Sequence, residues 1–205
     1  MTTALKVDNN ALISGKRGTV FVAPAGTPLP TDLTKLLISA DAPDPAWQNL
    51  GHTSESNLPS WDKSGGDAST LNTWLMSGAK TTYAPTSISV KVKALQANAE
   101  TLKFVYNGWD DASGGVAVAL DPASQPVALI VLSYDPDSRK PFGTYMSDTS
   151  MKSDGMPDFS GDFVEFGFTA SVESSSVISP SSDGTKAALV FLPPSAFTAK
   201  PDGGH

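Results

Sequence analysis

The stretch Thr86-Ser87-Ile88-Ser89-Val90-Lys91-Val92-Lys93-Ala94 alternates between apolar and polar side chains along most of its length. In an extended chain successive side chains point to opposite faces. Ile88, Val90 and Val92 therefore fall on one face, and the hydroxyl and lysine side chains fall on the other. This period of two predicts a β-strand over residues 86–94 with one face in a core and one polar face.

Segments with the same extended character lie on both sides of this strand. They cover residues 18–24, 46–53, 116–120, 127–134, 142–146, 159–174 and 187–192. The 17 glycines and 16 prolines break the pattern between them, as is typical of antiparallel sandwiches and barrels. Residues 127–134 are apolar on both faces, which predicts a strand covered on both sides. The expected fold class is mainly β, an antiparallel β-sandwich or barrel.

One segment, about residues 98–107, favours an α-helix. Asn98 is a suitable N-cap, because its side chain can accept a hydrogen bond from a first-turn amide. Gly108 suits the left-handed residue that often ends a helix. Leu102 and Val105 give the helix an apolar face, so we expect it to flank the sheet.

The domain organisation that we expect is a single β domain over residues 15–194 with extended termini. Residues 1–14 form an N-terminal arm and residues 195–205 a C-terminal tail. Residues 54–83 are a long loop or hairpin insertion, with Leu71–Met76 as one arm of the hairpin. These three segments have few apolar anchors, so we expect them to be mobile in a free subunit and ordered on assembly.

Composition excludes several classes of function. The 205-residue chain has 21 acidic and 14 basic residues, a net charge of −7, and only two of its bases are arginine. A nucleic-acid binder needs a basic patch, usually with arginine, so this chain is not built to grip phosphate. The absence of cysteine excludes disulfides and thiolate chemistry. No apolar run reaches the roughly 18 residues of a membrane span, so we expect no membrane partner.

The motifs of enzymes and metal sites are missing or incomplete. His52 is the only internal histidine, and no nucleophile can be paired with it from the sequence. Asp135 and Asp137 begin a pattern like a calcium loop, but Lys140 and Met146 occupy the positions of the glycine and the final glutamate. A hairpin turn explains this stretch better. We therefore predict no enzyme activity, no catalytic residue, no cofactor and no metal site.

Several short motifs follow one another in a recognisable order. They are Gly18-Thr19-Val20-Phe21-Val22-Ala23-Pro24-Ala25-Gly26-Thr27, Pro30-Thr31-Asp32, Trp47-Gln48-Asn49-Leu50-Gly51-His52-Thr53-Ser54, Gly66-Asp67, Thr81-Thr82-Tyr83 leading into residues 87–95, and Glu100-Thr101-Leu102. Their order and spacing resemble the major tail proteins, or tail tube proteins, of long-tailed (siphovirus-type) phages that infect actinobacteria. The resemblance covers about residues 15–192.

This resemblance implies a structural virion protein with a tail-tube β-sandwich and a helix on its flank. In that family six subunits form a ring whose inner sheets join into one barrel, and stacked rings form the tube through which the genome is ejected. The implied partners are further copies of the chain, the tape measure protein, the tail terminator, the distal tail and baseplate proteins, and double-stranded DNA in transient, non-specific passage. The implied location is the virion tail, with assembly in the host cytoplasm.

Within that expectation two strands have polar faces long enough to line a channel. The residues expected to face the lumen are Ser87, Ser89, Lys91, Lys93, Glu165, Thr169, Ser171 and Glu173. We expect the two lysines to pair with the two glutamates across strands, which leaves the wall near neutral to negative. The residues expected between rings are Trp61, Leu71, Trp74 and Met76.

A different class of protein, a carbohydrate-binding or adhesin-like β-sandwich, is the alternative. In that case the four tryptophans of this chain would serve as stacking platforms for sugars. Concentration-dependent tubes favour the first class, and glycan binding by a stable monomer favours the second.

Overall fold

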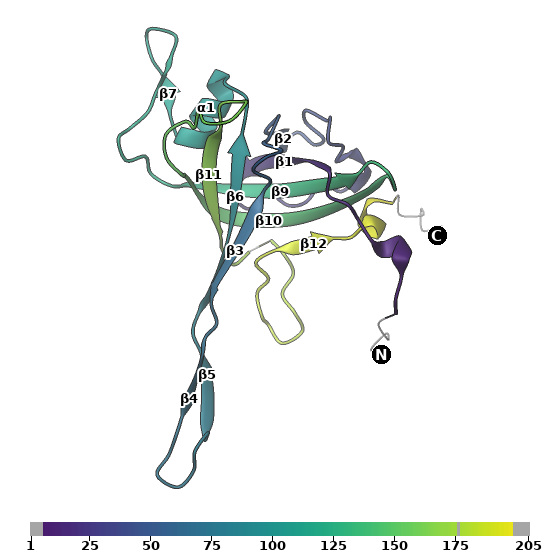
Figure 1. Ribbon diagram of the computed structural model, residues 1–205, viewed down its shortest axis with the longest axis vertical. Coiled ribbons are helices and arrows are strands. Elements are labelled where there is room, and N and C mark those ends of the chain that lie inside the picture. Colours follow the sequence, from purple (N-terminus) through teal and green to yellow (C-terminus); the bar gives the residue numbers. More distant parts are fainter. Residues whose placement is uncertain (1–5, 176, 199–205) are drawn as a thin grey trace.

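The computed structural model describes residues 6–175 and 177–198, and its centre is one large antiparallel sheet (Figure 1). The strand order is β2-β1-β9-β10-β11-β6-β3, and β12 also pairs with β10. The strands are β1 (Arg17–Pro24), β2 (Gln48–Asn49), β3 (Ser60–Gly65), β6 (Thr86–Ala94), β9 (Gln125–Asp135), β10 (Lys140–Ser153), β11 (Phe166–Val172) and β12 (Val190–Leu192). The mainly β, antiparallel fold predicted from the sequence is confirmed.

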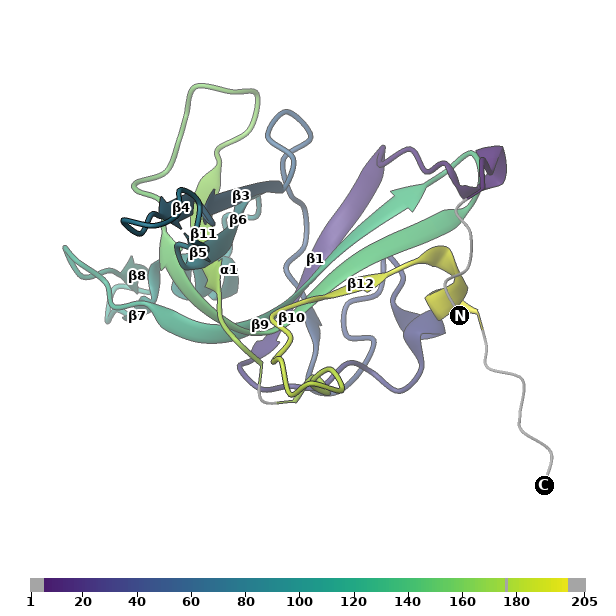
Figure 2. The ribbon, with the colours of Figure 1, turned by 90° about the horizontal axis from the view of Figure 1, so that it is seen from below.

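The long strand β10 divides the sheet into two halves. Residues up to Met146 pair with β9 on one side, and Gly143–Tyr145 pair with β12 on the other. After a register shift against β9 between Met146 and Thr149, residues 149–151 still pair with β9, and residues 149–153 pair with β11 on the other side. A bulge of this kind bends a strand and increases its twist. Figure 2 shows the result: β9 and β10 curve from β1 and β12 toward the group formed by β3, β6 and β11. We call β3, β6, β11 and Thr149–Ser153 of β10 the four-stranded half-sheet.

The segment that contains β2 brings the two ends of the curved sheet together. At one end the Leu50 amide donates to the Val20 carbonyl at 2.8 Å. At the other end the Ser54 amide donates to the Lys93 carbonyl at 2.9 Å, and the Leu95 amide donates to the His52 carbonyl at 2.9 Å. Residues 48–54 therefore bridge β1 and β6, and the sheet wraps around a core as an open barrel.

Two apolar clusters lie on opposite sides of β1, β9 and β10. The first, inside the curved sheet, includes Val20, Val90, Val92, Leu129, Met151, Phe166 and Phe168. The second, on the outer side, includes Phe21, Leu36, Trp47, Ala128, Ile130, Leu132 and Leu192. Alternate residues of β9 belong to different clusters, which confirms that this strand is covered on both faces.

The helix α1 (Ala99–Tyr106) packs on the first cluster, as its apolar face predicts. Phe104 meets Phe168 edge to face, with ring centroids 5.8 Å apart. The Asn98 side chain accepts the Thr101 amide at 2.9 Å, so the predicted N-cap is confirmed. The prediction for the other end was wrong: the left-handed residue is Asn107, with φ of 50°, and not Gly108. Asparagine tolerates this conformation, and its side-chain amide also reaches the Ala123 carbonyl at 3.3 Å.

The predicted long loop at residues 54–83 is mostly a hairpin. β3 belongs to the main sheet, where Ser60–Gly65 pair with Thr86–Lys91 of β6. Beyond it β4 (Ala68–Leu71) pairs with β5 (Lys80–Tyr83). The prediction that Leu71–Met76 form one side of the hairpin was wrong, because only Leu71 is in a strand. We call residues 66–84 the arm and residues 72–79 its tip; Figure 1 shows the arm extending away from the body.

Gly65 lies where the arm leaves the main sheet. Its φ is 80°, and a Cβ atom built there would lie 2.0 Å from the Pro85 carbonyl oxygen. The next residue, Gly66, also has a positive φ of 78°. The hairpin therefore changes direction at these two residues, between the β3–β6 and β4–β5 ladders, where most other side chains would be strained.

Other element boundaries differ from the expected ones. The expected strands at 46–53 and 116–120 shrink to β2 and to β8 (Val116–Ala117), which pairs with β7 (Trp109–Asp110). Those at 159–174 and 187–192 begin later, at Phe166 and Val190, and that at 142–146 is part of the longer β10. The remaining helices are short 3₁₀ turns, η1 (Asn9–Ala11), η2 (Leu33–Lys35) and η3 (Pro194–Phe197).

The turn between β9 and β10 is the predicted hairpin turn. The Asp135 carboxylate accepts the Ser138 hydroxyl at 2.8 Å and the Asp137 amide at 3.0 Å. These hydrogen bonds, the Ser138 hydroxyl first, lower the pKa of Asp135 from its usual 3.8 to about 2. The Asp135 carboxylate therefore accepts hydrogen bonds from its own turn.

The ends of the chain differ in how they meet the body. At the C-terminal end Ala196 and Phe197 of η3 pack on the second cluster, so the compact part extends beyond residue 194. At the N-terminal end the Ser14 amide donates to Asp135 at 3.3 Å. Residues 1–5 of the predicted N-terminal arm and 199–205 of the predicted tail lie outside the described residues.

Candidate interaction surfaces

The four-stranded half-sheet has one apolar face and one polar face. Cross-strand partners share a face, so the register places Val90 of β6 beside Ala170 of β11 on the core side. The same register places Ser89 beside Ser171, and Lys91 beside Thr169, on the other side. The alternation predicted for residues 86–94 is therefore correct, and that predicted for residues 159–174 holds within β11, so two strands contribute to one continuous polar surface.

The polar surface is wider than the sequence indicated, because β3 and β10 extend it on both sides. We call it the polar face. Its members are Ser60, Asp62 and Ser64 of β3, Ser87, Ser89, Lys91 and Lys93 of β6, Gly167, Thr169 and Ser171 of β11, and Ser150 and Lys152 of β10. All of these residues are polar or glycine. Polar residues alternate at 150–152, and at 60–64 only if Lys63 is set aside, so these runs are too short and irregular to identify without the pairing.

Two lysines of the polar face, Lys93 and Lys152, are paired with aspartates beside it. The Lys152 ammonium lies 2.8 Å from the Asp121 carboxylate, and the Lys93 ammonium lies 3.8 Å from that of Asp154. The expected pairing of Lys91 and Lys93 with Glu165 and Glu173 was wrong, since Asp154 is the partner of Lys93. Asp154 also accepts the Thr169 hydroxyl.

Glu165 does not lie on the polar face, contrary to the expectation. It precedes β11 and is only 8% exposed. Its carboxylate accepts the Ser54 hydroxyl at 2.5 Å and the Asn57 side-chain amide at 2.9 Å. Ser54 ends the closing segment 48–54 and Asn57 lies in the turn that follows it, so Glu165 holds the barrel together. Glu173, by contrast, is exposed just after β11 ends.

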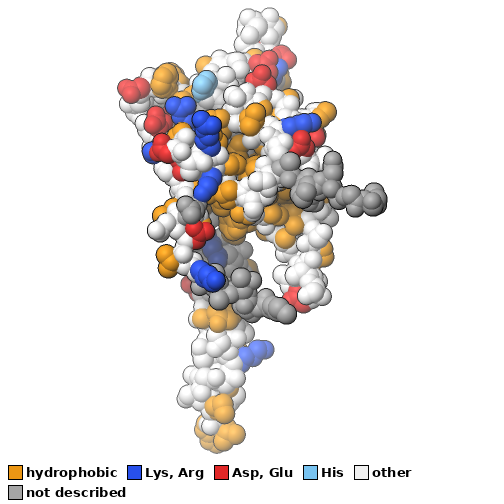
Figure 3. All heavy atoms as spheres, turned by 90° about the vertical axis from the view of Figure 1, so that its right-hand side faces the viewer, with side chains coloured by type: hydrophobic (Ala, Val, Ile, Leu, Met, Phe, Trp, Pro, Cys, Tyr) orange, Lys and Arg blue, Asp and Glu red, His pale blue; other side chains and the backbone are white. Residues whose placement is uncertain are grey.

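The arm carries a concentration of exposed apolar side chains at its tip. Trp74 and Leu75 are almost fully exposed, and Met76 is more than half exposed. The turn itself is ordered by hydrogen bonds: the Thr73 hydroxyl accepts the Met76 amide at 3.0 Å, and the Asn72 side chain accepts the Gly78 amide at 2.6 Å. Figure 3 shows the apolar cluster at the end of the arm.

The four residues expected between rings do not form one group. Trp74 and Met76 lie at the tip, and Leu71 lies just before it at the end of β4. Trp61 lies at the base of the hairpin, opposite Val90, and lines an open groove of about 890 Å³ with Leu58 and His52. The sequence did not single out Leu75, although it follows Trp74 directly.

The described residues do not hold an arrangement suited to catalysis or metal binding. Within residues 6–175 and 177–198 no group of three or more histidine, cysteine, aspartate or glutamate side chains is placed to hold a metal ion. His52 is exposed beside the groove, and no hydrogen bond joins its ring to another described side chain. No helix in the described part of the chain is long and apolar enough to cross a membrane.

The four-stranded half-sheet with its polar outer face, and the projecting arm with its apolar tip, are both suited to contacts with further copies of the chain. The comparisons with known proteins agree. The chain belongs to the phage tail tube protein family, whose model matches residues 5–177. It is also 27% identical over 140 residues to the major tail protein Gp23 of Mycobacterium phage D29, an alignment that covers 64% of this chain and 70% of that protein.

Family membership confirms the resemblance drawn from the motif order. The protein is a structural subunit of a phage tail tube, it is a component of the virion tail, and its family is not an enzyme family. The carbohydrate-binding alternative gains no support from these comparisons.

Proposed function

We propose that copies of this chain, six by family resemblance, form a closed ring in which the polar face of every subunit lines a channel for double-stranded DNA. The observation that carries the proposal is the uniform chemistry of that face, which runs unbroken across β3, β6, β11 and β10. A sheet of this width with a polar outer face and open edges invites pairing with another sheet. Closing the ring removes those edges.

The chemistry of the polar face suits the passage of DNA without binding it. Serine and threonine hydroxyls remain hydrated and offer no fixed positive charge to phosphate. Two of its lysines are paired with aspartates, at 2.8 Å and 3.8 Å, so their charge is partly cancelled at the surface. Phosphate binding depends on lysine and arginine, and the polar face has no arginine.

Rings would stack through the arm. Its apolar tip is too exposed to stabilise a free subunit, and burying a tryptophan removes on the order of 150–250 Å² from water. Stacking by unlike surfaces produces an open-ended polymer, which is the geometry of a tube. Trp61 is a separate contact at the base of the hairpin, and we retain it as a residue of the subunit interface.

The remaining partners follow from the position of such a tube in a phage tail. The tape measure protein would occupy the channel during assembly, and the tail terminator and the distal tail or baseplate proteins would meet the two ends of the tube. Assembly would take place in the host cytoplasm, and the completed tube would carry the genome during ejection.

The test places positive charge on the polar face. Ser89→Lys with Ser171→Lys changes two neighbours on adjacent strands, and Ser56→Lys with Ser182→Lys is a control with the same charge at exposed positions outside the face. We expect tubes of the first variant to retain short double-stranded DNA on sedimentation, in a manner that salt reverses. Wild-type and control tubes should retain much less. Equal retention by the variant and control tubes would contradict the proposal.

A further inference from the structure

The end of the four-stranded half-sheet opposite the arm carries a second exposed apolar feature. Residues 154–165 join β10 to β11, and within them Met156, Phe159 and Phe163 are 82%, 75% and 68% exposed. We call this segment the apical loop. Two backbone hydrogen bonds of 2.9 Å between Asp158 and Glu165 close its neck. Phe159 and Phe163 therefore lie in a loop whose two ends are held together, and Met156 lies just before it.

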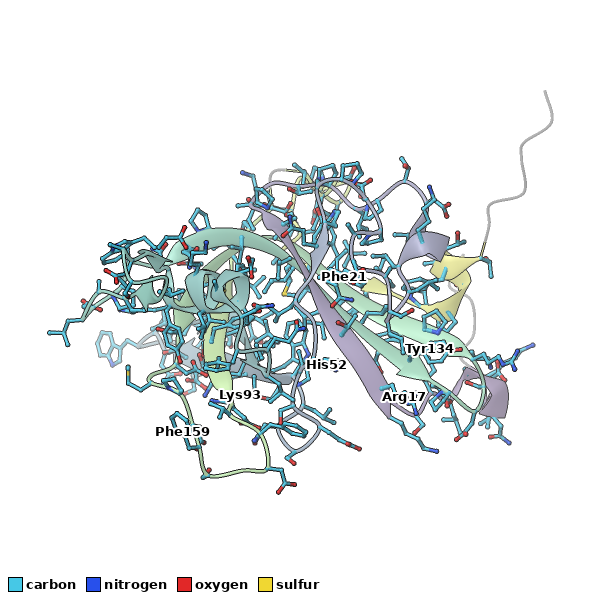
Figure 4. All side chains as sticks on the ribbon, turned by 90° about the horizontal axis from the view of Figure 1, so that it is seen from above. Arg17, Phe21, His52, Lys93, Tyr134 and Phe159 are labelled. Carbon is cyan, nitrogen blue, oxygen red and sulfur yellow. The ribbon has the colours of Figure 1, made fainter. Side chains whose placement is uncertain are left out.

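The strand β6 places the apical loop and the arm at opposite ends of the subunit. Thr86 of β6 pairs with Gly65 where the arm begins, and Ala94 pairs with Phe166 where the apical loop ends. The nine residues of β6 span about 30 Å at the usual rise of a strand. Figure 4 shows Phe159 on the same side of the half-sheet as Lys93.

The two features also have complementary charge. Between Ala68 and Tyr83 the only charged residue of the arm is Lys80, next to the tip. The apical loop carries Asp154, Asp158 and Asp162 before Glu165, and has no basic residue. One apolar surface therefore bears a positive charge and the other bears several negative charges, which favours contact between the two.

We infer that the apical loop of one subunit is the docking site for the arm tip of a subunit in the next ring. Trp74 and Leu75 pack on Phe159, Phe163 and Met156, and Lys80 faces the aspartates of the loop. The contact joins unlike surfaces at opposite ends of identical subunits, so it repeats indefinitely along the tube. The inference rests on the proposed stacking of rings and specifies what the arm binds.

A second apolar surface is a weaker match for the tip. A groove of about 740 Å³ lies between η2 and η3, lined by Leu37, Leu132, Pro141 and Phe197. Arg139 and Lys140 also line it, so Lys80 would approach charges of its own sign. This groove is the competing acceptor in the test.

The test uses the absence of cysteine from the chain. Leu75→Cys is combined with Phe159→Cys in one variant and with Leu37→Cys, an exposed groove residue, in a second. The tip and the apical loop of one chain are much farther apart than the roughly 7 Å that limits the Cα separation in a disulfide. Any disulfide between them therefore joins two copies.

The result expected after oxidation of assembled tubes is a ladder of linked chains on a non-reducing gel for Leu75→Cys with Phe159→Cys alone. A ladder for the Leu37→Cys pair instead would overturn the inference and assign the tip to the groove. Tubes visible by electron microscopy without a ladder in either variant would also overturn it, while the stacking of rings would stand. If wild-type protein forms no tubes, the proposed function itself fails.

Charge reversal provides a second measurement that does not depend on cysteine. Lys80→Glu should slow tube growth, because it places a negative charge against the acidic loop. Adding Asp162→Lys should restore growth, whereas Lys35→Glu, at an exposed position on η2, should have little effect. If Asp162→Lys does not restore growth to Lys80→Glu, the loop is not the acceptor.

Discussion

At the scale of single residues, Glu165 links three parts of the subunit. Its carboxylate binds Ser54, at the end of the segment that closes the barrel, and Asn57, just after it. Its backbone closes the neck of the apical loop. It also stands immediately before β11. A change at this residue therefore affects closure of the barrel and both ends of the loop that we assign to stacking.

We predict that Glu165→Ala destabilises the free subunit by about 2–3 kcal/mol, because hydrogen bonds to a buried charged group contribute about 1.5–3 kcal/mol each and Ser54 and Asn57 would lose their acceptor. Urea unfolding at neutral pH measures the change. Glu173→Ala, at an exposed site after the same strand, is the matched control and should stay within about 0.5 kcal/mol of wild type. Equal unfolding free energies for the two variants would contradict this role of Glu165.

At the scale of elements, strands with strict alternation could be predicted from the sequence, and residues that depend on pairing could not. Residues 86–94 alternate along their own length, so the strand and its two faces were correct. Glu165 fits the alternation of residues 159–174, but β11 begins one residue later. No local sequence pattern predicts that Ser54 and Asn57 cover its side chain. Ser60, Asp62 and Ser64 joined the polar face only when the register of β3 against β6 was known.

At this scale, the prediction that tests assembly most directly concerns the arm. We expect Trp74→Ser, Leu75→Ser and Met76→Ser together to leave a folded subunit, because all three side chains are exposed and pack on no core. Loss of a tryptophan anchor costs about 2 kcal/mol or more at an interface, so the concentration needed for tubes should rise by roughly 30-fold or more.

Light scattering during assembly measures that concentration, and circular dichroism checks the fold. The matched control is Val118→Ser with Leu120→Ser, which removes exposed apolar side chains after β8. If the tip variant assembles at the same concentration as this control, the arm does not hold rings together.

At the scale of the whole molecule, the acidic turns differ in charge from the polar face. The net charge of −7 comes largely from aspartates, many of which lie in turns such as those at Asp111 and Asp183. Two of the three lysines on the polar face are paired with aspartates beside it. In the proposed tube, an acidic exterior would keep free subunits apart in solution, and the polar face would leave DNA unbound.

The central claim, that the polar face lines the channel, is tested most directly by a cryo-electron microscopy map of tubes grown from the purified wild-type protein. The account predicts rings in which β3, β6, β11 and the second part of β10 form a continuous inner barrel, with Ser89, Lys91 and Ser171 pointing into the lumen. A map in which these side chains lie on the outside of the tube, or are buried between subunits, would contradict the claim.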